Sequence, residues 1–347
     1  MQSYYFLLLL IFLVNFLIYI KFSFFETKYN VFSFPDKLRR FHKKKTSLFG
    51  GIFILTNLII SFVYFIFSSN EVIIFEKTYF YINNEYYLRS FFSFLFGSIF
   101  FFFLGYLDDK FKLSPFNKLF GSALILFIII LVDSTLLIKI LKFQSIPHKI
   151  YLDEFSFFFT VLCFLFLNIS LNMFDGIDLQ AGIYVLIIFV ILILNKILIF
   201  LIIPIVLGVI FYLYLNYKKK TFFGDSGINI LSFIISYIFI KSYNFKDIFY
   251  ADEIFIILIL PSLELIRLSF TRTLSGKNPM IGDRTHIHHC LEFYFRSNTY
   301  LVLFVIILSF LPYLLTTFFQ MNHFYVIVIY SLFYVFFIHF VKKKKFK

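Results

Sequence analysis

The sequence has no tryptophan, two cysteines and few charged side chains, and each shortage excludes a class of protein. Only 15% of the residues are charged and 61% are hydrophobic, so a water-soluble domain cannot bury all the apolar surface. Cys163 lies in an apolar run and Cys290 lies beside histidines, which gives no disulfide framework. Tyrosine must replace tryptophan as the aromatic residue at membrane interfaces. The composition therefore predicts a polytopic membrane protein.

Long apolar runs predict an all-α fold of about eleven transmembrane helices, in a single integral-membrane catalytic domain of residues 1–347. About 20 apolar residues cross the hydrocarbon core. The first run lacks a basic n-region and a cleavage site, which favours a membrane span over a secretory signal. The predicted spans are 4–20, 49–68, 90–107, 119–138, 155–174, 183–194, 197–217, 227–240, 254–270, 299–318 and 322–341.

The stretch 183–217 has two interpretations. It is interrupted only by Asn195 and Lys196, so it forms either two short spans joined by a tight turn or one overlong helix. Pro204 and Gly208 are candidate positions for a kink in its second part.

The distribution of lysine and arginine predicts an outside N-terminus and an inside C-terminus. With this orientation, 23 of the 32 basic residues fall on the cytoplasmic side, as the positive-inside rule requires. The outer loop 139–154, with three lysines, is a mild exception. The net charge of +13 then indicates topology and attraction to anionic lipid, and no nucleic-acid partner is expected. The motif-bearing cytoplasmic loops are 21–48, 108–118, 175–182, 218–226 and 271–298.

Four polar islands interrupt the apolar sequence, at residues 105–109, 172–178, 222–227 and 283–289, and all four fall on the predicted cytoplasmic side. Carboxylates at a membrane edge cost free energy, which indicates a functional role. A membrane transporter or a lipid-linked-sugar flippase is the alternative class, but it would place charged groups across the middle of the membrane. The one-sided placement favours an enzyme that joins a soluble cytoplasmic substrate to a lipid-borne one.

The first two islands carry paired acidic residues. Asp108 and Asp109 are adjacent and can share a metal, orient a lysine or accept a proton, and the following lysines can hold phosphate oxygens. The alternative is a solvated charged loop. Asn172, Asp175 and Asp178 are spaced by three, so they lie near one another if the helix continues. The alternative there is a polar turn between two spans.

The other two islands suit phosphate binding. Gly224, Asp225, Ser226 and Gly227 predict a tight loop at a helix start, where backbone N–H groups and a carboxylate converge on a metal-bound phosphate. An N-cap role for Asp225 or Ser226 is compatible with this interpretation. The histidine-rich island favours binding of phosphate and sugar; structural zinc and surface histidines without a role are the alternatives.

As a set, these motifs resemble the polyprenyl-phosphate N-acetylhexosamine-1-phosphate transferases of glycosyltransferase family 4, over about residues 36–290. The phospho-MurNAc-pentapeptide transferase of peptidoglycan synthesis is in the same family, and the His-x-His-His loop is more similar to the N-acetylhexosamine branch. The residues that carry the resemblance are Arg39…His42…Thr46 with Gly50-Gly51, Gly105…Asp108-Asp109…Lys118, Asn172…Asp175-Gly-Ile-Asp178, Gly224-Asp225-Ser226-Gly227 and Arg272…Gly276…Asp283-Arg284…His286-Ile-His-His289.

Several positions depart from the family pattern. Leu179-Gln180 stands where Gly-Leu is expected, and Asn168 comes one place early. Ser47, Ile228 and Glu264 replace a proline, a serine and an aspartate. These changes touch the nucleotide and sugar pockets, while the residues for phosphate and metal are retained. We therefore expect an active enzyme, with a degenerate, inactive family member as the alternative.

The resemblance implies transfer of an N-acetyl-aminosugar 1-phosphate from a UDP-sugar to polyprenyl (undecaprenyl) phosphate, with release of UMP. The reaction would initiate a lipid-linked cell-surface glycan such as O-antigen, at the cytoplasmic face of a bacterial inner membrane. Phospho-MurNAc-pentapeptide transfer is the runner-up, and a homodimer is compatible with the sequence. Implied roles are catalytic for Asp108, Asp109, Asp175, Asp178 and Lys118; substrate-binding for Lys112, Gly176, Phe223, Gly224, Arg272, Asp283, Arg284, His286, His288 and His289; and Mg²⁺-binding, or alternatively Mn²⁺-binding, for Asp225 and Asn172.

Overall fold

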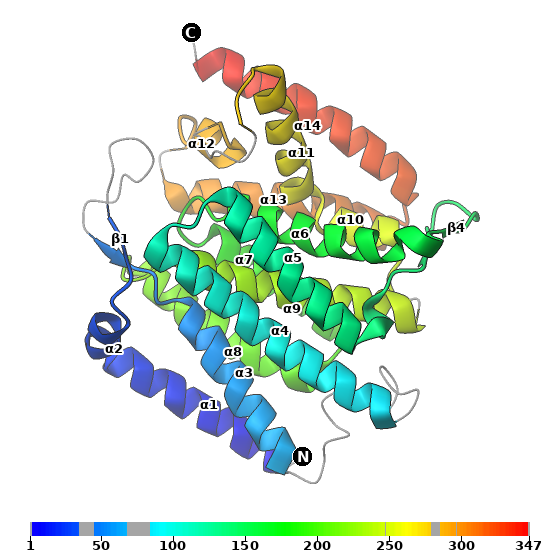
Figure 1. Ribbon diagram of the computed structural model, residues 1–347. Coiled ribbons are helices and arrows are strands. Elements are labelled where there is room, and N and C mark those ends of the chain that lie inside the picture. The colour runs from blue at the N-terminus through cyan, green and yellow to red at the C-terminus, as the bar shows by residue number, and fades with distance from the viewer. Residues whose placement is uncertain are drawn as a thin grey trace. The chain divides into compact units, whose positions relative to one another are not determined.

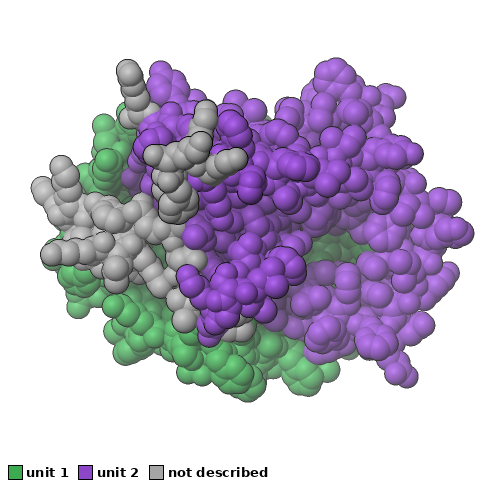
Figure 2. Space-filling view, turned by 90° about the horizontal axis from the view of Figure 1, so that it is seen from above, with its two compact units in different colours: residues 1–136, 182–246 green, residues 137–181, 247–347 purple. Residues whose placement is uncertain are grey.

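The computed structural model describes residues 2–34, 45–67, 84–246, 248–278, 285–295 and 297–345, and these are mainly helical (Figure 1). The chain divides into two compact units, which Figure 2 colours separately. Unit 1 contains residues 1–136 and 182–246, and unit 2 contains residues 137–181 and 247–347.

Unit 1 is a helical assembly around α9 (Gly224–Lys246), which is almost entirely buried. A short antiparallel ribbon pairs Phe32 with Ser47 and Ser33 with Thr46, and Thr221 bridges to it at Ser47. The other elements of the unit are α1 (Gln2–Ile20), α2 (Phe22–Tyr29), β1 (Phe32–Ser33), β2 (Thr46–Ser47), α3 (Gly51–Phe67), α4 (Asn84–Phe111), α5 (Pro115–Val132), the 3-10 helix η2 (Ser134–Leu136), most of α7 (Gln180–Leu194) and α8 (Ile199–Tyr217).

Glycines let the helices of unit 1 approach closely, as small residues do in membrane bundles. A Cβ atom added to Gly105 of α4 would lie 2.4 Å from the backbone oxygen of Asp225 in α9. A Cβ added to Gly97 would lie 2.1 Å from the ring of Phe233, also in α9. At a third contact, a Cβ on Gly51 of α3 would lie 2.7 Å from the backbone of Gly227. The register of α4 against α9 is therefore fixed by a ring contact at Gly97 and a backbone contact at Gly105.

Unit 2 contains the remaining helices and a second short ribbon, in which Ile140 pairs with Tyr151. Its 142–145 segment is anchored by Asp252, whose carboxylate accepts hydrogen bonds from the backbone N–H groups of Gln144 (3.0 Å) and Ser145 (3.1 Å). The elements are β3 (Ile140–Leu141), β4 (Ile150–Tyr151), the 3-10 helix η3 (Asp153–Phe155), α6 (Ser156–Phe174), α10 (Ala251–Ile257), α11 (Ile259–Leu274), α12 (Ile287–Leu291), α13 (Asn298–Phe318) and α14 (His323–Lys345).

The helices confirm an all-α polytopic membrane protein. In the described part of the chain, seven helices are long and apolar enough to cross a membrane, or nine if each of two bent helix pairs is one span. The shorter apolar helices α3 and α7 overlap two further predicted spans. Each of the eleven predicted segments overlaps a helix, whereas the number of spans and their orientation stay predictions.

Two predicted spans differ in detail from the observed helices, and the structure decides between the two interpretations of the 183–217 stretch. The 254–270 span is broken into α10 and α11, which meet at 82°; Pro261 lies in the first turn of α11, where its missing N–H costs no helical hydrogen bond. The 119–138 span ends at Val132 because Asp133 caps α5 and the chain enters η2. The 183–217 stretch forms two helices, since Lys196 and Leu198 adopt left-handed φ angles of 57° and 43° in the turn.

Candidate functional site

Three acidic side chains and one lysine from α4, α5 and α9 meet in unit 1. We call Asp108, Asp109, Lys118 and Asp225 the carboxylate–lysine cluster. Lys118 Nζ lies 2.7 Å from Asp108 Oδ2 and 2.6 Å from Asp225 Oδ1. The structure therefore brings together residues from two of the polar islands that are more than a hundred positions apart in the sequence.

The short connection between α4 and α5 places Lys118 opposite Asp108. Lys112 turns the chain with a left-handed φ of 52°, and the N–H of Leu113 donates to Asp108 Oδ1 at 2.9 Å. Ser114 then caps α5 by accepting a hydrogen bond from the N–H of Asn117, with Pro115 at the first helical position. Lys118 consequently extends from the first turn of α5 toward the end of α4.

Asp109 holds the start of α9 through its carboxylate. Its two oxygens accept the N–H groups of Asp225 (2.8 Å) and Ser226 (3.0 Å), and a negative charge is favourable at a helix N-terminus. Gly224 makes this approach possible: its φ is +70°, and a Cβ there would lie 2.6 Å from Asp109 Oδ2. Asp109 therefore fixes the backbone of Asp225, while Lys118 fixes the Asp225 side chain.

The cluster carries an excess of negative charge. It contains three carboxyl groups and one ammonium group, and the ammonium contacts two of them. The exposed fractions of the side chains are 10% for Asp108, 22% for Lys118 and 30% for Asp225. These oxygens fit Mg²⁺, which proteins hold with one or two carboxylates together with substrate phosphates. Among the residues that the structure describes, no three or more His, Cys, Asp or Glu side chains are grouped so that they could hold a metal ion, so a cation here would need ligands from a substrate as well. Of Asp108, Lys118 and Asp225, Asp225 has the most exposed side chain, so its carboxylate could reach a bound cation most easily.

The island at 172–178 lies at the end of α6 in unit 2. Asp175 is the C-cap of α6, and its N–H donates to Leu171 O at 3.0 Å. Gln180 Nε2 closes the turn by donating to Phe174 O at 2.8 Å. Leu179, which stands where the family pattern has glycine, adopts a left-handed φ of 71°. This is the backbone conformation that glycine adopts without strain, so the departure from the family pattern falls at a position with a glycine-type geometry.

The histidines lie on and beside the short helix α12, also in unit 2. His288 and His289 have ring centroids 4.4 Å apart, and His286 and His288 stack with centroids 5.5 Å apart. Gly176 lies against His288, because a Cβ added to Gly176 would be 1.9 Å from His288 Nε2. The island at 172–178, which we call the nucleotide island after the role that the family resemblance gives it, is thus in contact with the histidines within unit 2.

Other predicted site residues have varied surroundings. The side chain of Lys112 is exposed, and that of Arg272 is buried near the end of α11. Phe223 is buried and stacks on Tyr212 with ring centroids 3.4 Å apart. Asn172 and Asp178 are half-buried. Asp283 and Arg284, together with the basic segment at 39–44, lie outside the described residues.

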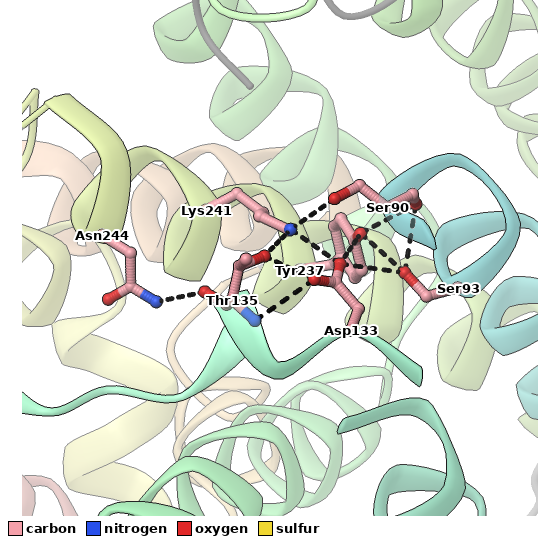
Figure 3. A network of polar contacts seen from close by, with 7 residues as sticks. All are labelled: Ser90, Ser93, Asp133, Thr135, Tyr237, Lys241 and Asn244. Carbon is pink, nitrogen blue, oxygen red and sulfur yellow. Dashed lines mark hydrogen bonds and ion pairs between the residues drawn. The ribbon is translucent and has the colours of Figure 1, made fainter. Parts of the chain in front are cut away.

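A second buried polar network in unit 1 was missed by the sequence analysis (Figure 3). Lys241 Nζ lies 2.6 Å from Asp133 Oδ2, and both side chains are almost completely buried. Tyr237 and Ser93 add hydroxyl contacts to the same Asp133 oxygen at 2.9 and 3.1 Å, and Thr135 bonds to both charged groups. Burial raises the pKa of Asp133, but the Lys241 charge and these hydrogen bonds outweigh it and hold the pKa below its usual value.

This network is separate from the carboxylate–lysine cluster. Lys241 follows Asp225 by sixteen residues in α9, which at 1.5 Å per residue is about 24 Å along the helix. Ser90 Oγ, near the beginning of α4, accepts from Lys241 at 2.7 Å, while Asp108 and Asp109 are at the other end of α4. The antiparallel pair α4–α9 therefore has one polar group of residues at each end.

Comparison with known proteins agrees with the motif-based resemblance. A search of curated proteins finds no match to this sequence. Residues 91–243 match the sequence model of the family described as Glycosyl transferase family 4. The matched segment includes the whole carboxylate–lysine cluster and the island at 172–178, and it ends before α11 and the histidines. The match supports a relationship of this membrane protein to the glycosyltransferase family 4 superfamily, and with it a general polyprenyl-phosphate sugar-1-phosphate transferase activity.

Proposed function

We propose that the protein transfers an N-acetyl-aminosugar 1-phosphate from a UDP-sugar to polyprenyl phosphate and releases UMP. The observation that supports this most directly is the contact of Lys118 with both Asp108 and Asp225, at the ends of helices that are long and apolar enough to cross a membrane. A lipid phosphate lies at headgroup depth while its isoprenoid tail stays in the bilayer. Charged groups at helix ends are suited to receive such a phosphate.

The chemistry forms one bond and breaks one. An oxygen of the lipid phosphate attacks the β-phosphorus of the UDP-sugar, and the bond from that phosphorus to the bridging oxygen breaks as UMP leaves. Such phosphoryl transfers depend mainly on positioning and charge stabilisation. The proposal gives Lys118 the task of holding a phosphate oxygen, and Asp108 the task of orienting the lysine and the lipid phosphate. Asp109 keeps Asp225 in place through the start of α9.

The proposed metal is Mg²⁺, with Asp225 as its principal protein ligand and Asn172 as the second ligand assigned from the family resemblance. When bound, the ion would neutralise charge that develops on the diphosphate and the leaving UMP. The resemblance also assigns Asp175, Gly176 and Asp178 to the nucleoside, and Arg272, His286, His288 and His289 to the diphosphate and sugar. The contact between Gly176 and His288 supports treating the two loops of unit 2 as one substrate-binding region.

The proposed setting is a bacterial inner membrane, with about eleven spans, an outside N-terminus and the reactive groups on the cytoplasmic face. Reporter fusions at residue 145 and at the C-terminus would test this orientation. The expected result is an extracytoplasmic reporter signal at residue 145 and a cytoplasmic signal at the C-terminus. The opposite signals would overturn the orientation, and with it access of cytoplasmic UDP-sugar to the cluster.

The function is tested with membranes that contain the protein, polyprenyl phosphate, Mg²⁺ and a panel of radiolabelled UDP-N-acetyl-aminosugars, including UDP-MurNAc-pentapeptide. We expect label in the lipid phase with release of UMP, and no label after EDTA. The Asp225→Asn variant should lose transfer, whereas Asp153→Asn, an exposed aspartate of η3, should retain it. Transfer by Asp225→Asn at the wild-type rate would contradict the metal assignment, and transfer of the pentapeptide substrate alone would select the other branch.

A further inference from the structure

The chain segment around His286 is held from both sides by side chains of α11. Glu264 Oε1 accepts the N–H of Ile287 at 2.8 Å, immediately after His286. Arg267 Nη2 donates to the backbone oxygen of Thr285 at 2.8 Å, immediately before it. The entry into α12 is therefore fixed by two hydrogen bonds to charged groups, which are stronger than bonds between neutral groups.

Tyr334 of α14 completes this arrangement. Its hydroxyl bonds to Glu264 Oε2 and accepts a hydrogen bond from Arg267 Nε at 3.0 Å. Arg267 also donates to Glu264 Oε1 at 2.7 Å and to Oε2 at 3.2 Å. The Glu264 side chain is only 2% exposed and that of Arg267 is 11% exposed. Because buried charges are costly unless they are paired and hydrogen-bonded, these three side chains form one interdependent unit.

We propose that Glu264, Arg267 and Tyr334 are positioning residues that hold the histidines of α12 in the geometry needed for the sugar nucleotide. This inference rests on the proposed function, which assigns His286, His288 and His289 to the diphosphate and sugar. The three residues act through α12 and do not themselves touch the substrate. We call them the α11–α14 frame.

The close contact between α12 and the nucleotide island makes this positioning consequential. The Gly176 backbone has no room for even a Cβ atom beside His288, so a small displacement of α12 changes the contact between the two loops. A misplacement of about 1 Å in a substrate-positioning group can cost on the order of 100-fold in rate. The frame connects the histidines to α11 and α14, two helices that pack against each other and against α13.

The chain contains a matched control tyrosine for Tyr334 and a cysteine that reports the opening of α12. Tyr330 lies one turn before Tyr334 in α14, is also buried, and donates its hydroxyl to Leu308 O at 2.8 Å, away from α12. Cys290 is a buried residue of α12, and Cys163 is the only other cysteine in the sequence. In a Cys163→Ala background, the rate of Cys290 alkylation by N-ethylmaleimide measures the opening of α12 without any reference to catalysis.

The experiment compares Tyr334→Phe, Glu264→Gln and Tyr330→Phe in the purified full-length protein. Tyr334→Phe removes one hydroxyl, and Glu264→Gln keeps an acceptor for Ile287 but removes the charge that holds Arg267. We expect both to raise the KM for the UDP-sugar and the Cys290 alkylation rate by about ten-fold each, the scale of one lost hydrogen bond to a charged group. The KM for polyprenyl phosphate should stay at the wild-type value. Tyr330→Phe should change none of these quantities.

The results separate the frame from the proposed function. Unchanged Cys290 alkylation in both Tyr334→Phe and Glu264→Gln would overturn the frame, whether or not the protein shows transferase activity. Equal acceleration in Tyr330→Phe would also overturn it, because any lost tyrosine hydroxyl of α14 would then have the same effect. Faster alkylation in the two frame variants, with no sugar-phosphate transfer by the wild-type protein, would support the structural frame and refute the proposed reaction.

Discussion

Replacing Lys118 by methionine is the sharpest test of the carboxylate–lysine cluster. The substitution keeps the aliphatic stem and removes an ammonium group that lies 2.6–2.7 Å from carboxylate oxygens of Asp108 and Asp225. A surface ion pair contributes below about 1 kcal/mol, and breaking a fully buried one costs about 3–5 kcal/mol. With side chains 10–30% exposed, each pair falls between these limits, so we expect Lys118→Met to lose about 2–4 kcal/mol of stability in the absence of divalent cations.

The same change makes the cluster a stronger cation site. Its formal charge goes from −2 to −3, so Mg²⁺ should raise the Tm of Lys118→Met by more than that of the wild-type protein. Sugar-phosphate transfer should nevertheless fall about 100-fold or more, because a positive group that stabilises developing phosphate charge is lost. Stability and activity are therefore expected to respond to Mg²⁺ in different ways.

The assay is thermal unfolding in detergent with and without Mg²⁺, together with transfer of label to polyprenyl phosphate. Lys118→Arg, which keeps the charge, should retain most of the stability and part of the activity. Lys110→Met, at an exposed lysine near the end of α4, controls for the loss of a positive charge at the membrane surface. An equal Mg²⁺ shift in Lys118→Met and the wild-type protein would refute the assignment of cation binding to this cluster.

Three further results are expected. Gly224→Ala should abolish transfer and lower the Tm, because φ is +70° and the new Cβ would lie 2.6 Å from Asp109 Oδ2; transfer at the wild-type rate would contradict this geometry. The lowered pKa of Asp133 stabilises the fold above the unfolded-state value of about 4, so the Tm difference between wild type and Asp133→Asn should shrink as the pH falls from 5 to 3. An equal Tm difference at pH 5 and at pH 3 would refute this. Leu179→Gly should not lower the Tm. Relief of the left-handed backbone strain contributes about 1–2 kcal/mol, which offsets the about 0.4–1 kcal/mol lost through the greater unfolded-state entropy of glycine. A clear Tm loss would show that the Leu179 side chain has a larger stabilising role.

The sequence was informative where a local pattern determines structure. Apolar length located the helices, and the acidic and glycine motifs identified Asp108, Asp109 and Asp225, which meet in the structure with Lys118. The break at Leu258 was missed because the apolar run 254–260 continues across it, although Pro261 was a local signal. Asp133 and Lys241 were missed because their pairing joins positions more than a hundred residues apart.

The histidine loop shows the same limit. Its motif predicted a cluster of histidines, but its support comes from Tyr334, 70 residues after Glu264 in the sequence. Arg267 falls inside the predicted span 254–270, and no spacing rule connects it to Tyr334 or to Thr285. The i, i+3 relation of Glu264 and Arg267 was the one available signal, since such a pair faces the same side of a helix.

The two polar ends of the α4–α9 pair have different physical roles. At the Asp133–Lys241 end one carboxylate and one ammonium balance, and hydroxyl groups of Ser90, Ser93 and Tyr237 surround them, so the pair is stable without a ligand. At the other end there are three carboxyl groups and one lysine, which contacts two of them, and the excess charge requires a cation or solvent. Gly97 and Gly105 fix the register between the ends by backbone and ring contact. The charge-balanced Asp133–Lys241 pair and the glycine contacts therefore hold α4 against α9, and the carboxylate–lysine cluster can keep unbalanced charges in a defined geometry. Electrostatic preorganisation requires such a geometry.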